Sequence, residues 1–182
     1  SKDEKTILDI KFVAQKSSVK NSAIYFIYLA DEFLCDAGIN AFIIPKSFCY
    51  SLGWNKCAQF IVQGLFKLVD MGMAFGNVLL EQVVFVRVKN QITEQFVNGL
   101  FEQQEIKEYA PVSKAIFSRY SVLLAGQTPA EIALIERILT AHKKTWGEYV
   151  LIERGLNWQS KVVDKPGRTP IYRGAQLKKY FL

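Results

Sequence analysis

The sequence predicts an α/β fold: the second half of an open sheet that ends in a strand pair, followed by a β-rich, basic C-terminal element. Helix-like and strand-like segments alternate between residues 22 and 89, which is typical of a sheet layered with helices. Half of the 182 residues are apolar, which is enough for a packed core. The positive charge of the chain is concentrated after these alternating segments end.

The first expected element is a helix from Ser22 to Ala37. Asn21 or Ser22 can cap its start, and Gly38 can end it as a left-handed residue. The apolar residues that recur at helical spacing are Ile24, Ile27, Tyr28, Phe33 and Leu34.

A short apolar strand, INAFIIP, follows at residues 39–45. A run of this kind after a helix predicts a central parallel strand whose two faces are both covered by helices. Pro45 ends it because proline cannot donate a hydrogen bond to the next strand. Ligands of open α/β sheets bind beyond the carboxyl ends of the strands, so the sequence predicts a ligand site at Pro45–Phe48.

A second helix is expected at residues 53–63, and a strand ending in a glycine turn at residues 65–72. Residues 78–89 give the clearest strand, because Val84, Val86 and Val88 alternate with Phe85, Arg87 and Lys89. These two strands are expected to form a hairpin-like pair.

Residues 91–126 are mixed, with strand-like stretches at 95–109 and 115–126 and turn signals at Asn98–Gly99 and Gly126. A helix then begins after Thr128, where Pro129 occupies the first helical position and Glu131 completes a capping box. Its apolar stripe consists of Ile132, Ile135, Ile138 and Leu139.

The net charge of +6 is unevenly distributed. Residues 137–182 carry ten Lys and Arg against three acidic residues, so the rest of the chain is close to neutral. This pattern predicts a polyanionic partner such as DNA. The alternative is a basic face that is merely solvated.

Other features limit the class of protein. Cys35, Cys49 and Cys57 lack C-x-x-C spacing and predict reduced thiols in the core of a cytoplasmic protein. No secretory signal or membrane-spanning apolar run is present, and no metal-binding or nucleotide-loop motif is found. The first residue is Ser1, which indicates either a trimmed tag or a segment of a longer protein.

The order of these segments resembles the adenine-N6-specific DNA methyltransferases. FIYLADEFLCDAGINAFIIPKSF (residues 26–48) is similar to the family pattern FIxxALxLLKxGGxLxFIxPxSF, with departures at Asp31, Cys35, Ala37 and Asn40. LVDMGMAFGNVLLEQVVFVRVK (residues 68–89) is similar to the strand pair of the same family. Residues 135–159 and 169–182 resemble the start of the target-recognition domain in its TaqI-like branch, which includes fused restriction–modification enzymes.

The resemblance implies a Rossmann-like methyltransferase sheet of which this chain is the second half. Residues 1–126 would then be a partial methyltransferase domain, and residues 127–182 a linker helix and the start of a DNA-recognition region. The family's S-adenosylmethionine loop and its Asn-Pro-Pro-Tyr/Phe tetrapeptide have no counterpart in residues 1–21. The chain alone is therefore expected to bind no cofactor and to be inactive, while the whole protein would use S-adenosyl-L-methionine.

The resemblance also assigns residues to roles. Pro45, Lys46, Ser47 and Phe48 would border the pocket for a flipped adenine, and Phe75 falls on the aromatic position that holds the extruded base. The alternatives are core packing for Phe75 and simple solvation for Lys46. Tyr25 and Phe26 lie on a helix that would pass near the donor site, where core burial is the competing reading.

In the basic C-terminal quarter we expect DNA contacts from Arg154, Lys161, Lys165, Arg168, Arg173, Lys178 and Lys179. The expected partner is double-stranded DNA. The unpaired side of strand 41–45 is expected to be covered by the missing half of the domain, by a second copy of the chain or by residues 7–13. Two other functions remain open: a stand-alone, non-enzymatic DNA-binding or specificity module, and an α/β interaction domain with an incidental basic tail.

Overall fold

The computed structural model describes residues 21–76, 78–141 and 146–151. The chain divides into two compact units, residues 1–141 and 142–182. The elements of the first unit are α2 (Ser22–Phe33), β1 (Ile39–Pro45), η2 (Lys46–Cys49), η3 (Leu52–Trp54), α3 (Asn55–Gly64), β2 (Leu65–Gly72), β3 (Gln82–Val88), β4 (Gln95–Glu102), β5 (Glu105–Ser113), α4 (Ala115–Tyr120) and α5 (Pro129–Ala141). The described part of the second unit contains the short 3₁₀ helix η4 (Trp146–Glu148).

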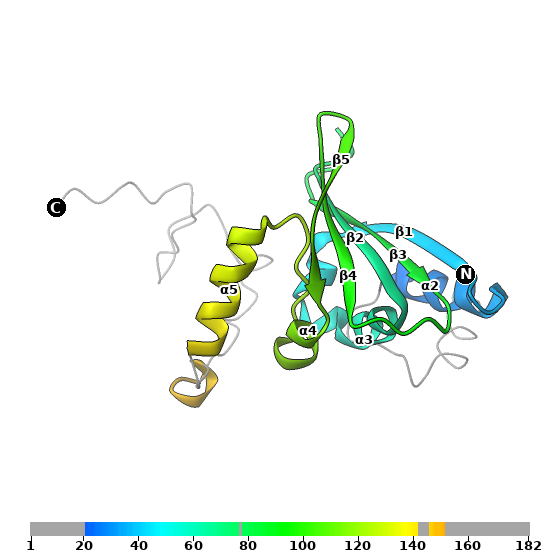
Figure 1. Ribbon diagram of the computed structural model, residues 1–182. Helices are drawn as coiled ribbons and strands as arrows, with labels where there is room; N and C mark the ends of the chain where they lie inside the picture. Colours follow the sequence, from blue (N-terminus) through cyan, green and yellow to red (C-terminus); the bar gives the residue numbers. More distant parts are fainter. Residues whose placement is uncertain (1–20, 77, 142–145, 152–182) are drawn as a thin grey trace, which may run out of the picture. The chain divides into compact units, whose positions relative to one another are not determined.

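The five strands form one mixed sheet in the order β1-β3-β2-β4-β5 (Figure 1). β3 lies between β1 and β2 and is antiparallel to both, so β1 and β2 run in the same direction. β4 is parallel to β2, and β5 returns antiparallel to β4. The ends of β1, β2 and β4 therefore meet at one edge, here called the carboxyl edge, and their beginnings meet at the opposite, amino edge.

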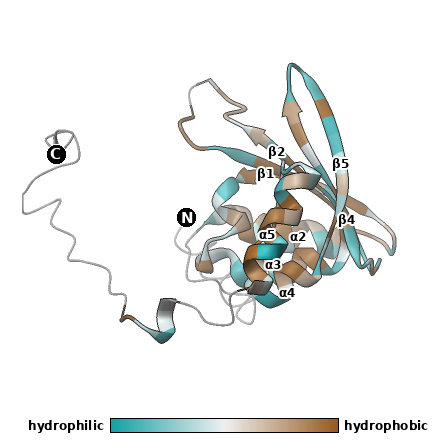
Figure 2. Cartoon of the chain, turned by 60° about the vertical axis from the view of Figure 1, so that its left-hand side comes forward, coloured by the Kyte–Doolittle hydropathy of each residue, from teal (hydrophilic) through white to brown (hydrophobic). Residues whose placement is uncertain are grey.

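The core lies between the sheet and the helices. Leu68 of β2 and Phe85 of β3 face the same side and are fully buried, together with Ile27 of α2 and Ile61 of α3. Figure 2 shows α2, α3 and α4 gathered beside the sheet, with hydrophobic segments among them. This burial of apolar side chains supplies most of the free energy that holds the sheet and helices together.

The other face of the sheet is also apolar but remains partly exposed in the described part of the chain. The register pairs Ile43 with Val84 and Ile39 with Val88 on this face. Ile39 and Ile43 are exposed, and Val84 and Val88 are only half-buried. We call this valine-rich surface the open face.

Several expected elements are confirmed. α3, β2, β3 and the helix–strand–helix–strand–turn–strand order follow the sequence pattern closely. The capping box of α5 is present, because the Thr128 amide donates to Glu131 Oε2 over 2.7 Å and the Glu131 amide donates to Thr128 Oγ1 over 3.4 Å. The thiols of Cys49 and Cys57 are buried and free as expected, whereas Cys35 is exposed.

The end of the first helix was predicted wrongly. α2 ends at Phe33, because Leu34 turns to an extended conformation while its amide still donates to the Asp31 carbonyl. The left-handed residue is Ala37, with φ of 59°, and not Gly38. Gly38 is needed for a different reason: a Cβ there would lie 2.8 Å from the Cys35 carbonyl oxygen.

The prediction of a central parallel strand at residues 39–45 is also wrong for the described sheet. β1 is an edge strand of the described sheet and pairs antiparallel with β3. Its burial alternates, with Asn40 and Ile44 buried and their neighbours more exposed. A continuous apolar run does not distinguish a strand covered on both faces from one that has an open face. Residues 7–13, one of the expected coverings of this strand, lie outside the described residues.

The region after residue 91 corrects two further expectations. Asn98 and Gly99 lie inside β4, and the β4–β5 turn is instead made by Gln103 and Gln104, both with left-handed φ. Residues 115–120 form the helix α4 and not a strand. Gly126 does form a turn, with φ of 82°.

Candidate functional site at the carboxyl edge

Lys46 lies at the carboxyl edge because Pro45 ends β1 and the chain turns into η2. Its backbone amide donates to the Glu81 carbonyl over 2.8 Å, which ties this turn to the residue before β3. Its ammonium group bridges two carboxylates, Asp70 Oδ2 at 2.7 Å and Glu81 Oε2 at 3.0 Å. One lysine therefore joins β1, β2 and the start of β3.

Asp70 is the buried centre of this cluster. It lies near the end of β2, and its Oδ1 accepts a hydrogen bond from the Gly72 amide over 3.0 Å. On the other side, a Cβ at Gly126 would lie only 2.8 Å from the Asp70 Cβ. A glycine is therefore required at 126 both for its positive φ and for this close approach.

Asn98 holds the Gly126 turn in place from β4. Its side chain is fully buried, accepts from the Gly126 amide over 2.7 Å and donates to the Gln127 carbonyl over 2.6 Å. Asn98 on β4 thus positions the segment that packs against Asp70 on the neighbouring strand β2.

The β2–β3 loop completes the edge. Its Ala74 amide donates to Gln82 Oε1 over 2.9 Å, and the Gln82 side-chain amide donates to the Leu80 carbonyl. Gln82 is buried, so it fixes the loop from within. The apolar side chains that this loop exposes are Met73, Phe75, Val78, Leu79 and Leu80.

The Lys46 charge is fully paired at this edge, because one ammonium group contacts two carboxylates. Burial alone would lower the pKa of Lys46, but its hydrogen bonds and charge interactions with Asp70 and Glu81 outweigh burial and raise it. Burial also raises the pKa of the Cys49 thiol to about 12, and the Asp70 charge adds to this effect. Cys49 is therefore protonated at neutral pH and is a packing residue, not a nucleophile.

The structure brings some of the predicted base-pocket residues together. Pro45, Lys46 and the Phe75 loop lie at the same edge of the sheet. Phe75 is 49% exposed. The Ser47 carbonyl oxygen accepts a hydrogen bond from the Ser51 amide over 2.8 Å, in the turn that follows η2.

Phe48 is a core residue. It is almost fully buried and packs edge-on against Trp54 and offset against Phe85, at centroid distances of 5.8 and 6.0 Å. The sequence predicted that Phe48 borders a ligand pocket. Its side chain instead packs in the core and is not exposed at the carboxyl edge.

The residues expected near a donor site lie on α2. Tyr25 is half-buried and packs against the core, whereas Phe26 is 61% exposed. The seven expected DNA-contact residues, from Arg154 to Lys179, lie outside the described residues, as does most of the expected recognition region at residues 127–182.

The sequence did not reveal the polar roles of Asp70, Glu81, Gln82 and Asn98 at this edge, whereas it did indicate the turn at Gly126. Asp70 offered a signal, since a carboxylate within an apolar strand must have a partner when buried. Asn98 looked like half of a turn because Asn-Gly is a common turn dipeptide.

In the described ranges, no group of three or more His, Cys, Asp or Glu side chains is arranged to hold a metal ion. No helix in the described part of the chain is long and apolar enough to cross a membrane.

No protein-family profile matches the chain, and no curated protein is significantly similar to it. Among solved structures, a chain from the cryo-EM structure of a DrdV–DNA complex is similar, with 16% sequence identity and a TM-score of 0.42. The similarity covers 69% of this chain and 16% of that one, so this chain spans a small part of that protein's length.

Proposed function

We propose that this chain is part of a site-specific adenine-N6 DNA methyltransferase, of a bacterial restriction–modification type, and that its carboxyl edge borders the pocket for the flipped adenine. The observation that carries the proposal is the Lys46–Asp70–Glu81 cluster at the same edge as the exposed Phe75 loop. Ligands of α/β sheets bind at this kind of edge.

The chemistry of the edge suits an extruded adenine. Adenine carries a hydrogen-bond acceptor at N7 and a donor at its N6 amino group. Lys46 supplies donors and the carboxylates of Asp70 and Glu81 supply acceptors. The exposed ring of Phe75 offers a stacking surface, and such stacking is worth roughly 1–3 kcal/mol per base.

The open face supports the view that further structure completes this domain. A valine-rich surface such as the one around Ile43 and Val84 is unusual on a soluble domain that acts alone. In the proposed protein it is covered by the part that binds S-adenosyl-L-methionine and carries the catalytic tetrapeptide. A stand-alone DNA-binding module is the second candidate, but it gives no reason for this surface.

The test is methylation of DNA by the whole protein that contains this chain. The protein is incubated with S-adenosylmethionine labelled on its methyl group and with unmodified genomic DNA, and label in N6-methyladenine is measured. We expect labelled adenine, and we expect Phe75→Ala to lower the rate about 10- to 100-fold, as the loss of one stacking contact predicts.

Phe66→Ala is the matched control, because Phe66 is 48% exposed, close to the value for Phe75, but lies at the beginning of β2 near the amino edge. Its rate should stay within about twofold of the native rate, since exposed substitutions away from a site have small effects. Absence of label in adenine would falsify the proposed reaction. Equal rates for the two variants would remove Phe75 from the base pocket.

A further inference from the structure

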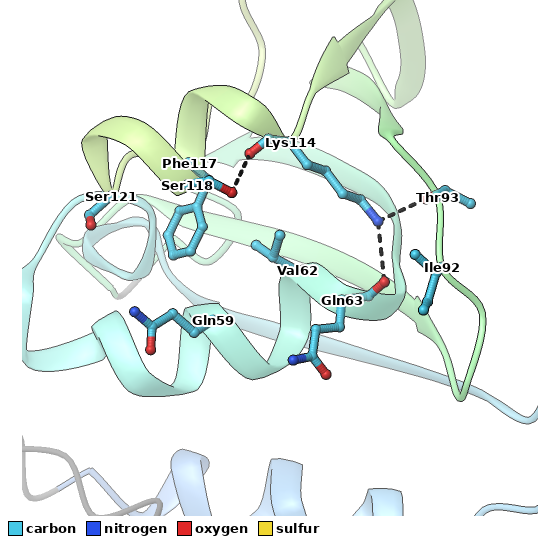
Figure 3. Close-up of a pocket in the computed structure, with 9 residues that line it drawn as sticks. All are labelled: Gln59, Val62, Gln63, Ile92, Thr93, Lys114, Phe117, Ser118 and Ser121. Carbon is cyan, nitrogen blue, oxygen red and sulfur yellow. Dashed lines mark hydrogen bonds between the residues drawn. The ribbon is translucent and has the colours of Figure 1, made fainter.

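A cavity lies at the opposite, amino edge of the sheet. It has a volume of about 560 Å³ and lies between α3, the segment before β4 and α4 (Figure 3). That volume falls within the range of roughly 300–1,000 Å³ typical of small-molecule sites. Val62 and Phe117 form apolar walls, and Gln59, Gln63 and Lys114 contribute polar groups.

Lys114 is the distinctive residue of this cavity. It is only 8% exposed, and its ammonium group donates to Thr93 Oγ1 over 2.7 Å and, more weakly, to the Gln63 carbonyl oxygen over 3.4 Å. Both partners are neutral, although an ammonium group has three protons and a full charge. Buried charges are normally paired with an opposite charge.

The negative charge that acts on Lys114 does not cancel the effect of burial. Burial lowers the pKa of Lys114, and the exposed carboxylate of Glu94 opposes this only in part. Among the described residues, the Lys114 ammonium group therefore forms no ion pair, and one of its three N–H groups has no acceptor.

A second cation borders the adjoining cavity, which has a volume of about 490 Å³ and shares Gln63 and Ile92 with the first. Arg87 lines it, is 4% exposed, and pairs through one terminal nitrogen with Asp31. Its Nε has no hydrogen-bond acceptor among the described residues. Two neighbouring cavities thus each contain a buried cation whose donors are incompletely used.

We propose that the Lys114 cavity binds a small molecule through a phosphate or carboxylate group, with Lys114 as the counter-charge. The oxyanion accepts a hydrogen bond from the remaining N–H of the ammonium group. Gln59 and Gln63 lie one helical turn apart on α3 and provide neutral amide donors at the mouth. Val62 and Phe117 contact the apolar body of the ligand.

This inference is independent of the proposed methyltransferase function, because the residues concerned lie at the other edge of the sheet. The competing explanation is structural: Lys114 would only join the end of α3 to the segment before β4. In that case the cavity has no affinity for oxyanions.

Isothermal titration calorimetry of the full chain distinguishes the two explanations. The probes are phenyl phosphate and benzoate, each with an apolar ring and one oxyanion, and neutral benzyl alcohol. We expect saturable binding of at least one oxyanion probe and none of benzyl alcohol. The oxyanion that binds identifies phosphate or carboxylate as the recognised group.

Lys114→Met should weaken this binding at least about tenfold, which is the effect of losing one charged hydrogen bond. Gln59→Glu is the second variant. It places a negative charge at the mouth on an exposed helical position, so it should fold normally and also bind at least about tenfold more weakly. Lys56→Met is the matched control, since it changes the net charge by the same amount at another exposed position of α3.

Lys56→Met should bind within about twofold of the native chain. The proposal is overturned if neither oxyanion binds at millimolar concentration, or if Lys114→Met and Gln59→Glu bind as tightly as the control. It is also overturned if Lys114-dependent binding is seen with a short DNA duplex but with neither small probe.

Discussion

Two lysines at opposite edges of the same sheet have opposite environments. Lys46 at the carboxyl edge contacts two carboxylates, and its pKa is raised. Lys114 at the amino edge contacts a hydroxyl and a carbonyl, and burial lowers its pKa. The difference lies in the partners and not in the residue type, because the Lys46 charge contacts carboxylates whereas Lys114 contacts only neutral groups among the described residues.

The two edges therefore suit different ligands. At the carboxyl edge the lysine is already paired with two carboxylates, and the carboxylate oxygens offer hydrogen-bond acceptors, which suit the amino group of a neutral base. At the amino edge the uncompensated charge favours an oxyanion. Substitutions at each edge can test whether this contrast is real.

The largest expected effect is at the carboxyl edge, in Asn98→Leu. The substitution leaves the part-buried Gly126 amide and Gln127 carbonyl without their side-chain partner, and each such loss costs about 1–3 kcal/mol. Urea denaturation should therefore show the free energy of unfolding lowered by about 3 kcal/mol. Gln95→Leu, on an exposed position of the same strand, should change it by less than about 0.5 kcal/mol. A loss below 1 kcal/mol in Asn98→Leu would mean that this network does not hold the edge.

Replacing each lysine should change the free energy of unfolding by a smaller amount, and the sign of the change should differ between the two lysines. Lys46→Met leaves Asp70 and Glu81 without their shared cation and should lower the free energy of unfolding by about 1 kcal/mol, a value reduced by solvent screening at this half-buried site. Lys114→Met replaces an uncompensated buried charge with an apolar chain and should be neutral or slightly stabilising. Equal losses in both variants would contradict the contrast between the edges.

The smallest effect is the pH dependence. Because the folded-state pKa of Lys114 is below its usual value of 10.5, the unfolded chain binds more protons in that interval. The native chain should therefore gain stability relative to Lys114→Met as the pH rises toward 10.5. For Lys46 the folded-state pKa is raised, so its contribution is complete below 10.5 and is lost as the pH rises through the folded value. Chemical denaturation of the three proteins between pH 8 and 11 measures both trends; parallel curves would contradict them.

The sequence predicted those elements whose signals are local. The period-two alternation in β3 and the Thr128–Glu131 capping box depend on neighbouring residues, and both are present in the structure. Pro45 likewise marked the end of β1 and so the carboxyl edge. The partners of Lys46 could not be predicted, because Asp70 and Glu81 reach it only through the strand order β1-β3-β2.

Asn98 and Lys114 show a second limit. Asn98-Gly99 has the composition of a turn, but the parallel pairing with β2 requires a strand there, and tertiary contacts outweigh this local preference. Lys114 looked like an ordinary charged residue, since only the packing of α3 and α4 buries it.

The position of β3 between β1 and β2 has a consequence for synthesis. The ribosome produces β1 first, yet its neighbour in the described sheet, β3, is made only after α3 and β2. The β2–β3 hairpin, a local contact, can form early, whereas β1 must wait for it with its isoleucines unpaired. Of the strands described, β1 is therefore the one whose nascent form most needs shielding by a chaperone.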